Sequence, residues 1–96
     1  MTPSSKTVLI TGGAKRLGRA IALHLGGAGW SVAVHYNASQ ADAEETVAAL
    51  HAKGVHAAAL QADLSLEDHT QRLIDDAHKA VGPLTALRSE EHTSEL

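Results

Sequence analysis

Short apolar runs alternate regularly with amphipathic patterns along this chain, and that alternation most constrains its fold. Val8, Leu9 and Ile10 form a compact aliphatic run that ends at glycines, and residues 31–36 and 55–62 form two further strand-like runs. After the first and third runs, apolar residues recur at three- and four-residue spacing, which is typical of helices that bury one face, and capping and stop residues indicate a helix after the second run. Strands alternating with helices through short links predict an α/β fold with a parallel sheet, right-handed crossovers and helices on both faces.

Turn and capping residues set the expected helix limits. The first helix should start near Leu17 and stop at Gly26, Gly27 and Gly29. The second should begin at Ser39 or Asp42 and end at Gly54. The third should be capped at Ser65 and stopped by Gly82 and Pro83. The apolar stripes are expected at Leu17, Ala20, Ile21, His24 or Leu25, and Ala28 of the first helix and at Leu66, Thr70, Leu73, Ile74, Ala77 and Val81 of the third.

The last nine residues, Arg88 to Leu96, depart from this pattern. Residues 84–87 begin a fourth strand, but the segment that follows is polar, acidic and without strand alternation. Its sequence, RSEEHTSEL, is identical to the in-frame translation of a widely used sequencing-library adapter. We therefore expect residues 1–87 to be a partial domain and residues 88–96 to be an artefactual tail on a truncated longer gene. The alternative is a natural polar tail.

Composition excludes several functional classes. The net charge is −3, with eight Lys and Arg against eleven Asp and Glu, so no general basic field attracts nucleic acid or an anionic membrane. The chain lacks cysteine, which excludes disulfides, cysteine zinc sites and a thiol nucleophile. Its seven histidines form no ligand-like cluster, so no metal site is expected. A short polar N-terminus without a signal-like segment favours the cytoplasm. Trp30 is expected to pack at a helix-to-strand corner.

The glycine-rich turn after the first strand is the main candidate site. Residues 11–18, Thr-Gly-Gly-Ala-Lys-Arg-Leu-Gly, lie between a strand and a helix, where backbone N–H groups and the helix dipole favour a pyrophosphate. Gly12 permits the tight turn, and Gly18 lets the helix approach the strand and the ligand. The segment lacks Gly-Lys-Ser/Thr, which excludes a P-loop. The alternative is a purely structural turn.

Thr11-Gly12 with Gly18 resembles the Thr-Gly-x-x-x-Gly-x-Gly turn of short-chain dehydrogenases/reductases, and this resemblance covers residues 6–87. Arg16 stands where that family usually has its middle glycine, and residues 13–19 are similar to the turn of pteridine reductases and their bacterial relatives. Residues 35–39, His-Tyr-Asn-Ala-Ser, also resemble the end of their second strand, without the arginine sometimes found at the Ala38 position. The resemblance implies the N-terminal part of a Rossmann doubly wound parallel sheet, in a dinucleotide-dependent oxidoreductase.

Cofactor preference depends on the end of the second strand, where an acidic residue would bind a ribose 2′-hydroxyl and neutral or basic groups would accept a 2′-phosphate. Tyr36, Asn37 and Ser39 belong to a stretch without an acid, and Lys15 and Arg16 add two cationic donors. NADP(H) is therefore the expected cofactor. The alternative is that both cations are simply solvated at a helix start. The resemblance adds an adenine contact through Asp63 and Leu64, with a helix-capping role as the alternative for Asp63. The expected cofactor-binding set is Gly12, Lys15, Arg16, Leu17, Gly18, Tyr36, Asn37, Ser39, Asp63 and Leu64.

The catalytic residues that the resemblance implies are not in this chain. Hydride transfer in the family uses a downstream Tyr-x-x-x-Lys pair with a serine or aspartate and an asparagine, whereas the only tyrosine here, Tyr36, is followed four residues later by Gln40. We expect the parent to be an enzyme, a dimer or tetramer acting on a small molecule such as a pteridine or carbonyl compound. This chain itself should be inactive and marginally stable, because a bare sheet edge would remain beside the first strand.

Two other hypotheses remain open. A stand-alone, non-catalytic nucleotide-binding module would still bind NADPH and would have a genomic stop codon after Leu96. A structural protein on a flavodoxin-like scaffold would bind no dinucleotide and would be indifferent to Arg16→Ala.

Overall fold

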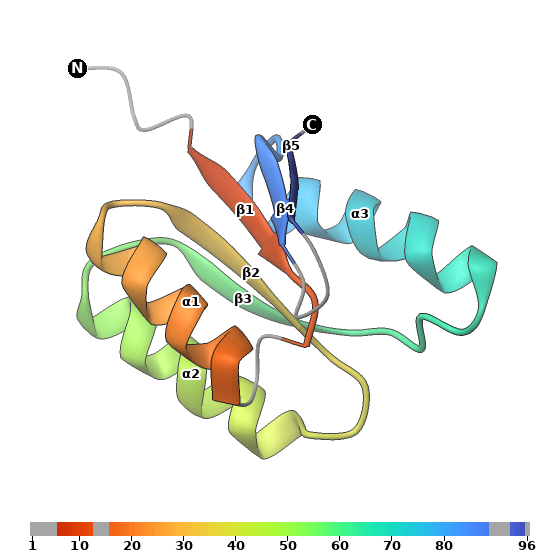
Figure 1. Cartoon of the computed structure of the whole chain (residues 1–96), viewed down its shortest axis with the longest axis horizontal. Coiled ribbons are helices and arrows are strands. Elements are labelled where there is room, and N and C mark those ends of the chain that lie inside the picture. Colours follow the sequence, from red (N-terminus) through yellow and green to blue (C-terminus); the bar gives the residue numbers. More distant parts are fainter. Residues whose placement is uncertain (1–5, 13–15, 89–92, 96) are drawn as a thin grey trace.

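The computed structural model describes residues 6–12, 16–88 and 93–95. Within these ranges, three helices and five strands follow one another in the order β1 (Thr7–Ile10), α1 (Arg16–Gly27), β2 (Ser31–Tyr36), α2 (Gln40–Ala52), β3 (Ala57–Gln61), α3 (Glu67–Val81), β4 (Ala86–Arg88) and β5 (Thr93–Glu95). They form one sheet with the strand order β3-β2-β1-β4-β5, in which the first four strands are parallel (Figure 1). The predicted α/β alternation is confirmed.

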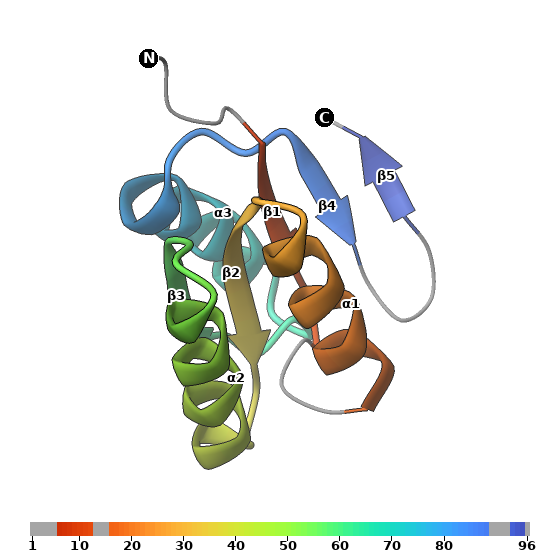
Figure 2. The same cartoon turned by 90° about the vertical axis from the view of Figure 1, so that its left-hand side faces the viewer.

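The helices lie on both faces of the sheet, as expected. Helices α1 and α2 cover one face and α3 covers the other (Figures 1 and 2). In β1, Val8 and Ile10 pack in the α1–α2 cluster, whereas Leu9 packs in the α3 cluster with Leu73 and Ala77. The central strand is thus buried on both faces, which explains its uninterrupted aliphatic run. Trp30 packs against the α1–α2 cluster at the corner before β2, as predicted.

The expected start of a fourth strand is confirmed, but the sheet beyond it differs from the expectation. Strand β4 pairs in parallel with β1, from Val8 opposite Ala86 to Ile10 opposite Arg88. Strand β5 then pairs antiparallel with β4, so the expectations of a bare edge next to β1 and of no strand in the tail were wrong. Because ladder hydrogen bonds use only backbone groups, an exposed edge can pair with a segment that lacks side-chain alternation.

Helix α1 runs through two of the glycines that were expected to stop it. The chain turns instead at Gly29, whose φ is +95°. Gly26 is buried, and a Cβ there would collide with a methyl group of Leu50 on α2. Of the expected stripe, Ile21 and Leu25 are partly buried and pack against the α1–α2 cluster, whereas Leu17, Ala20 and Ala28 are exposed. The buried positions of α1 are Gly18, Ala22 and Gly26. Small residues on this face allow close packing between α1, α2 and the sheet.

Two matched substitutions test the packing role of Gly26. Gly27→Ala adds a Cβ whose nearest neighbour is the Lys53 Nζ at 3.9 Å, so it should raise the free energy of unfolding by about 0.5 kcal/mol through helix propensity. Gly26→Ala displaces the buried Leu50 and should lower the free energy of unfolding by about 1 kcal/mol. Urea titrations followed by circular dichroism measure both, and equal effects would contradict close packing at Gly26.

The starts of α2 and α3 differ from the caps that were predicted from the sequence. Ser39 occupies the N-cap position of α2, but its side chain makes no capping bond. Helix α3 has Leu66, not Ser65, at its N-cap, because the Ser65 hydroxyl donates to Asp63 Oδ1 at 2.6 Å. Leu66 and Thr70 are exposed, so the buried stripe of α3 starts only at Leu73.

Candidate functional site

The candidate site lies at the point in the sheet where the crossover helices change from one face to the other. Helix α1 connects β1 to β2 on one face, and α3 connects β3 to β4 on the other, so the switch point falls between β1 and β4. In open α/β sheets, ligands bind outside the carboxyl ends of the strands at such a point. Gly12 follows β1 there with φ +66°, a left-handed conformation that favours glycine.

A buried histidine bridges the ends of three strands at this edge. The backbone N–H of Gly12 donates to His35 Nδ1 at 3.0 Å, and His35 Nε2 lies 2.8 Å from the carbonyl oxygen of Ala62. The side chain therefore joins the turn after β1, the end of β2 and the residue after β3. From the sequence, His35 was one of seven unclustered histidines and the first residue of the 35–39 segment, and no binding role was predicted for it. Its position near the end of an otherwise apolar buried strand was the available signal.

The two contacts fix the protonation state of His35. Nδ1 accepts the Gly12 N–H, so it carries no proton, while Nε2 must donate because the Ala62 carbonyl can only accept. The ring is therefore the neutral Nε2–H tautomer. Burial lowers the pKa of His35 below its ordinary value of 6.5, and the hydrogen bond to the Ala62 carbonyl opposes part of that shift.

This lowered pKa predicts a pH dependence of stability. Below pH 6.5 the unfolded chain protonates His35 before the folded chain does, so the free energy of unfolding falls as the pH drops through that window. The contribution is complete above about pH 6.5. Urea titrations at pH 7.5, 6.5 and 5.5 should show a smaller loss for His35→Asn than for the unsubstituted chain. Equal losses would contradict burial of a neutral ring.

The expected 2′-phosphate residues lie at the end of β2. Tyr36 is half-buried and packs against the α1–α2 cluster, while the Asn37 side chain is exposed. The Asn37 carbonyl accepts from Gln61 Nε2 at 3.1 Å, and the Tyr36 carbonyl accepts the Ala62 N–H at 3.1 Å. These contacts hold the ends of β2 and β3 together. Ser39 follows at the start of α2, so the three residues share one rim.

Asp63 lies next to the histidine bridge and closes a tight turn. Its Oδ1 accepts the Ser65 N–H at 3.0 Å and the Ser65 hydroxyl at 2.6 Å. The hydroxyl bond and then the N–H bond lower the pKa of this carboxyl group, which is therefore ionised at neutral pH. The capping alternative for Asp63 was wrong, because its side chain orders this turn and does not cap α3. Leu64 is 38% exposed beside it.

Only some residues of the glycine turn are among those that the structure describes. Lys15 and the side chain of Arg16 lie outside the described residues, although α1 begins at Arg16. Leu17 is 56% exposed, and Gly18 is buried one residue further on. The described residues therefore bring Gly12, the end of β2 and Asp63 to one edge of the sheet, and Leu17 and Leu64 are both exposed.

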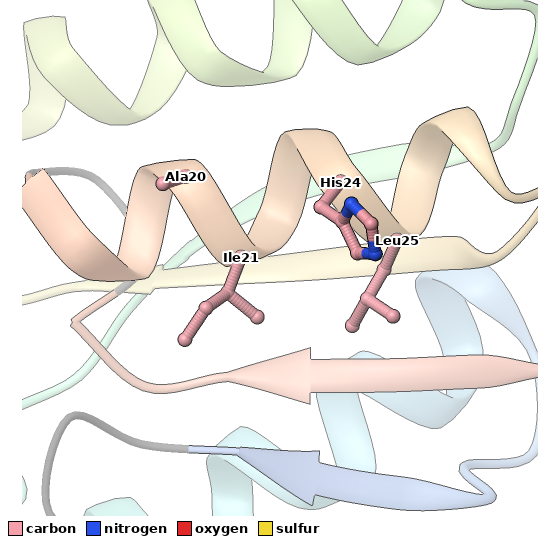
Figure 3. Close-up of a pocket in the computed structure, with 4 residues that line it drawn as sticks. All are labelled: Ala20, Ile21, His24 and Leu25. Atoms are coloured by element: carbon pink, nitrogen blue, oxygen red, sulfur yellow. The ribbon is translucent and has the colours of Figure 1, made fainter.

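A pocket of about 370 Å³ lies elsewhere, on the flank of α1. Ala20, Ile21, His24 and Leu25 line it, and the side chains of Ile21 and Leu25 point toward β1 (Figure 3). Its position along the helix flank separates it from the carboxyl edge of the sheet. Within the described residues, no set of three potential ligands could hold a metal ion, and no helix is long and apolar enough to cross a membrane.

Known proteins resemble this chain in sequence and in fold. A family model for short chain dehydrogenases matches residues 6–89. The chain is 37% identical over 83 residues to 3-oxoacyl-[acyl-carrier-protein] reductase of Staphylococcus aureus, covering 86% of this chain and 34% of that protein. A structure of a putative dehydrogenase from Burkholderia cenocepacia with bound NADP has 46% identity and a TM-score of 0.85, with 92% of this chain and 34% of that one covered. The FolM alternative dihydrofolate reductase 1 of Brucella canis, complexed with NADP, has 35% identity and a TM-score of 0.81, with 86% and 33% covered.

The fold and the similarity to known proteins together identify the class of protein. The β3-β2-β1-β4 order, with a glycine turn after β1, is the N-terminal half of a Rossmann doubly wound sheet. The chain belongs to the short-chain dehydrogenase family, and it spans about a third of the length of the relatives it matches.

Proposed function

We propose that this chain is the cofactor-binding part of an NADP(H)-dependent reductase. The observation that carries the proposal is the carboxyl edge of the sheet, where Gly12 is hydrogen-bonded to His35 of β2, Asn37 and Ser39 follow that strand, and no acid occurs in residues 36–39. A carboxylate at this position would repel a 2′-phosphate, whereas neutral donors accept it. The NADP-bound Burkholderia and Brucella structures, at 46% and 35% identity, support the same cofactor.

The proposed binding residues have separate tasks. Gly12 and Gly18 shape the turn, and the N-terminus of α1 faces the pyrophosphate. Lys15, Arg16 and Leu17 flank the phosphates, while Tyr36, Asn37 and Ser39 surround the 2′-phosphate. Asp63 accepts from the adenine amino group, and Leu64 covers the ring. When bound, the cofactor supplies the hydride.

The reduction needs catalytic residues that lie later in the sequence than the cofactor-binding residues of this chain. We propose that the parent enzyme reduces a pteridine or carbonyl compound, works as a dimer or tetramer in the cytoplasm, and carries Tyr-x-x-x-Lys beyond Leu87. The dihydrofolate reductase name of one relative favours the pteridine, and the 3-oxoacyl reductase name of another favours the carbonyl. Residues 88–96 are then not part of the native sequence.

Sequencing the native gene past the Leu87 codon tests this proposal. We expect Asn-Asn-Ala directly afterwards and Tyr-x-x-x-Lys further on, and the encoded enzyme should oxidise NADPH with a dihydropterin, a ketone or a 3-oxoacyl thioester. The 96-residue chain should show no turnover. A genomic stop codon after Leu96 would contradict the reductase. If the chain nevertheless bound NADPH, it would be a stand-alone nucleotide-binding module.

A further inference from the structure

Gly12 does not offer its N–H to a ligand. That N–H is donated to His35 Nδ1, so the peptide plane that opens the glycine turn is held from inside the sheet. The residue itself sits at φ +66°, so the orientation of this peptide sets the direction in which the chain leaves β1. Whatever fixes this peptide therefore fixes the direction of the turn.

His35 holds this peptide from a rigid position. Its side chain is 6% exposed, its backbone lies in β2 between β1 and β3, and its other nitrogen is anchored 2.8 Å from the Ala62 carbonyl. Ala62 is fully buried and immediately precedes Asp63. The same ring thus ties the phosphate end of the candidate site to its adenine end.

We propose that His35 is a positioning residue for the dinucleotide, whose neutral ring aligns the glycine turn with the adenine-side loop. This inference rests on the proposed function and names a residue outside the proposed contact set. A second proton would turn Nδ1 into a donor facing the Gly12 N–H, and two donors cannot share a hydrogen bond. Protonation should therefore release the turn and weaken cofactor binding.

Other charged or titratable groups on the segments around the bridge could also affect its titration. Asp63 follows Ala62 directly, and the Asp63 N–H donates to His69 Nδ1 on α3. Arg72, also on α3, donates to the Gln61 carbonyl at 3.3 Å. Among the described residues, the titratable or charged groups on the segments that adjoin the bridge are Tyr36 on β2, Asp63 after β3, and His69 and Arg72 on α3, while Lys15 and the side chain of Arg16 lie outside the described residues.

Two substitutions separate the halves of the bridge. In His35→Asn, the amide oxygen can take the place of Nδ1 and keep the Gly12 bond, while the reach to Ala62 is lost. In His35→Gln, the longer amide can reach Ala62 but leaves Gly12 without its acceptor. His51→Gln is the matched control, because His51 Nε2 also contacts a β3 carbonyl, that of Ala57 at 3.1 Å, but is exposed at the opposite end of the strand.

The binding test is calorimetric titration of the 96-residue chain with NADP⁺, which withstands mild acid, at pH 7.5 and 5.5. At pH 7.5 we expect His35→Gln to bind roughly tenfold more weakly than the unsubstituted chain, and His35→Asn and His51→Gln to stay within about threefold. At pH 5.5 the unsubstituted chain and His51→Gln should lose more affinity than His35→Asn. All of them share the titration of the 2′-phosphate, so the difference isolates His35.

A measurement without cofactor tests the role of His35 separately from the proposed NADP(H)-binding function. In nitrogen-15 NMR spectra, His35 Nδ1 should be unprotonated at pH 7.5, and the Gly12 amide signal should follow the ionisation of His35 but not that of His51. Failure of the unsubstituted chain to bind NADP⁺ would refute the proposed function. A Gly12 amide that ignores His35 ionisation, or His35→Gln binding as tightly as the unsubstituted chain, would overturn the role of His35.

Discussion

Asn37→Asp should weaken NADPH binding to the chain by about tenfold or more, while NADH binding stays equal or tightens. The Asn37 side chain is exposed at the end of β2, and the change adds one negative charge with almost no change in shape. A carboxylate within about 4 Å of a 2′-phosphate costs roughly 1 kcal/mol in water-like surroundings and more in a partly closed site. The same carboxylate can accept from a free ribose 2′-hydroxyl.

Calorimetric titrations with both cofactors measure this change in preference. Ala80→Glu is the control, because it adds the same charge on an exposed position of α3, which ends at Val81. We expect the control to leave both affinities within about twofold. If Asn37→Asp and Ala80→Glu behaved alike, the end of β2 would not face the 2′-phosphate.

Leu50→Ala should cause the largest loss of stability, about 2–5 kcal/mol. Leu50 is fully buried on α2 and packs in the cluster that joins α1, α2 and the sheet. Its removal leaves a cavity beside Gly26, which has no side chain to fill it. In a small domain this loss is a large share of the total stability, so we expect the variant to be mostly unfolded at 25 °C.

Leu17→Ala provides the comparison for the same chemical change. Leu17 is 56% exposed, so its truncation should alter the free energy of unfolding by no more than about 0.5 kcal/mol. Urea unfolding can be followed by the fluorescence of Trp30, the only tryptophan, which packs on the same face as Leu50. Similar losses of unfolding free energy in Leu50→Ala and Leu17→Ala would contradict the burial of Leu50 between α1, α2 and the sheet.

The alternation of strands and helices could be predicted because it depends on local periodicity. Val8, Leu9 and Ile10 must be buried on both faces, and this follows from three adjacent aliphatic residues. Gly54, with φ +82°, follows the C-cap of α2, as its place after the helical pattern indicated. The position of the glycine turn at the end of β1 also followed from the order of elements.

The features that were missed depend on contacts between distant segments. Gly26 was expected to stop α1, but it lies inside the helix. The side chain of Leu50, on α2, occupies the space that a Cβ at Gly26 would need. The His35 bridge joins residues 23 and 27 positions apart, so no local pattern shows it. Strand β5 was missed because pairing at a sheet edge depends on backbone groups rather than on side-chain alternation.

The affinity of the 96-residue chain for NADPH relative to NADH tests the cofactor assignment most directly. Calorimetry at pH 7.5 should give binding of NADPH at least about tenfold tighter than that of NADH, because only NADPH carries the 2′-phosphate that the acid-free rim accepts. Equal affinities would contradict the assignment of this rim to NADP(H). Absence of binding by a chain that unfolds cooperatively would contradict the cofactor site itself.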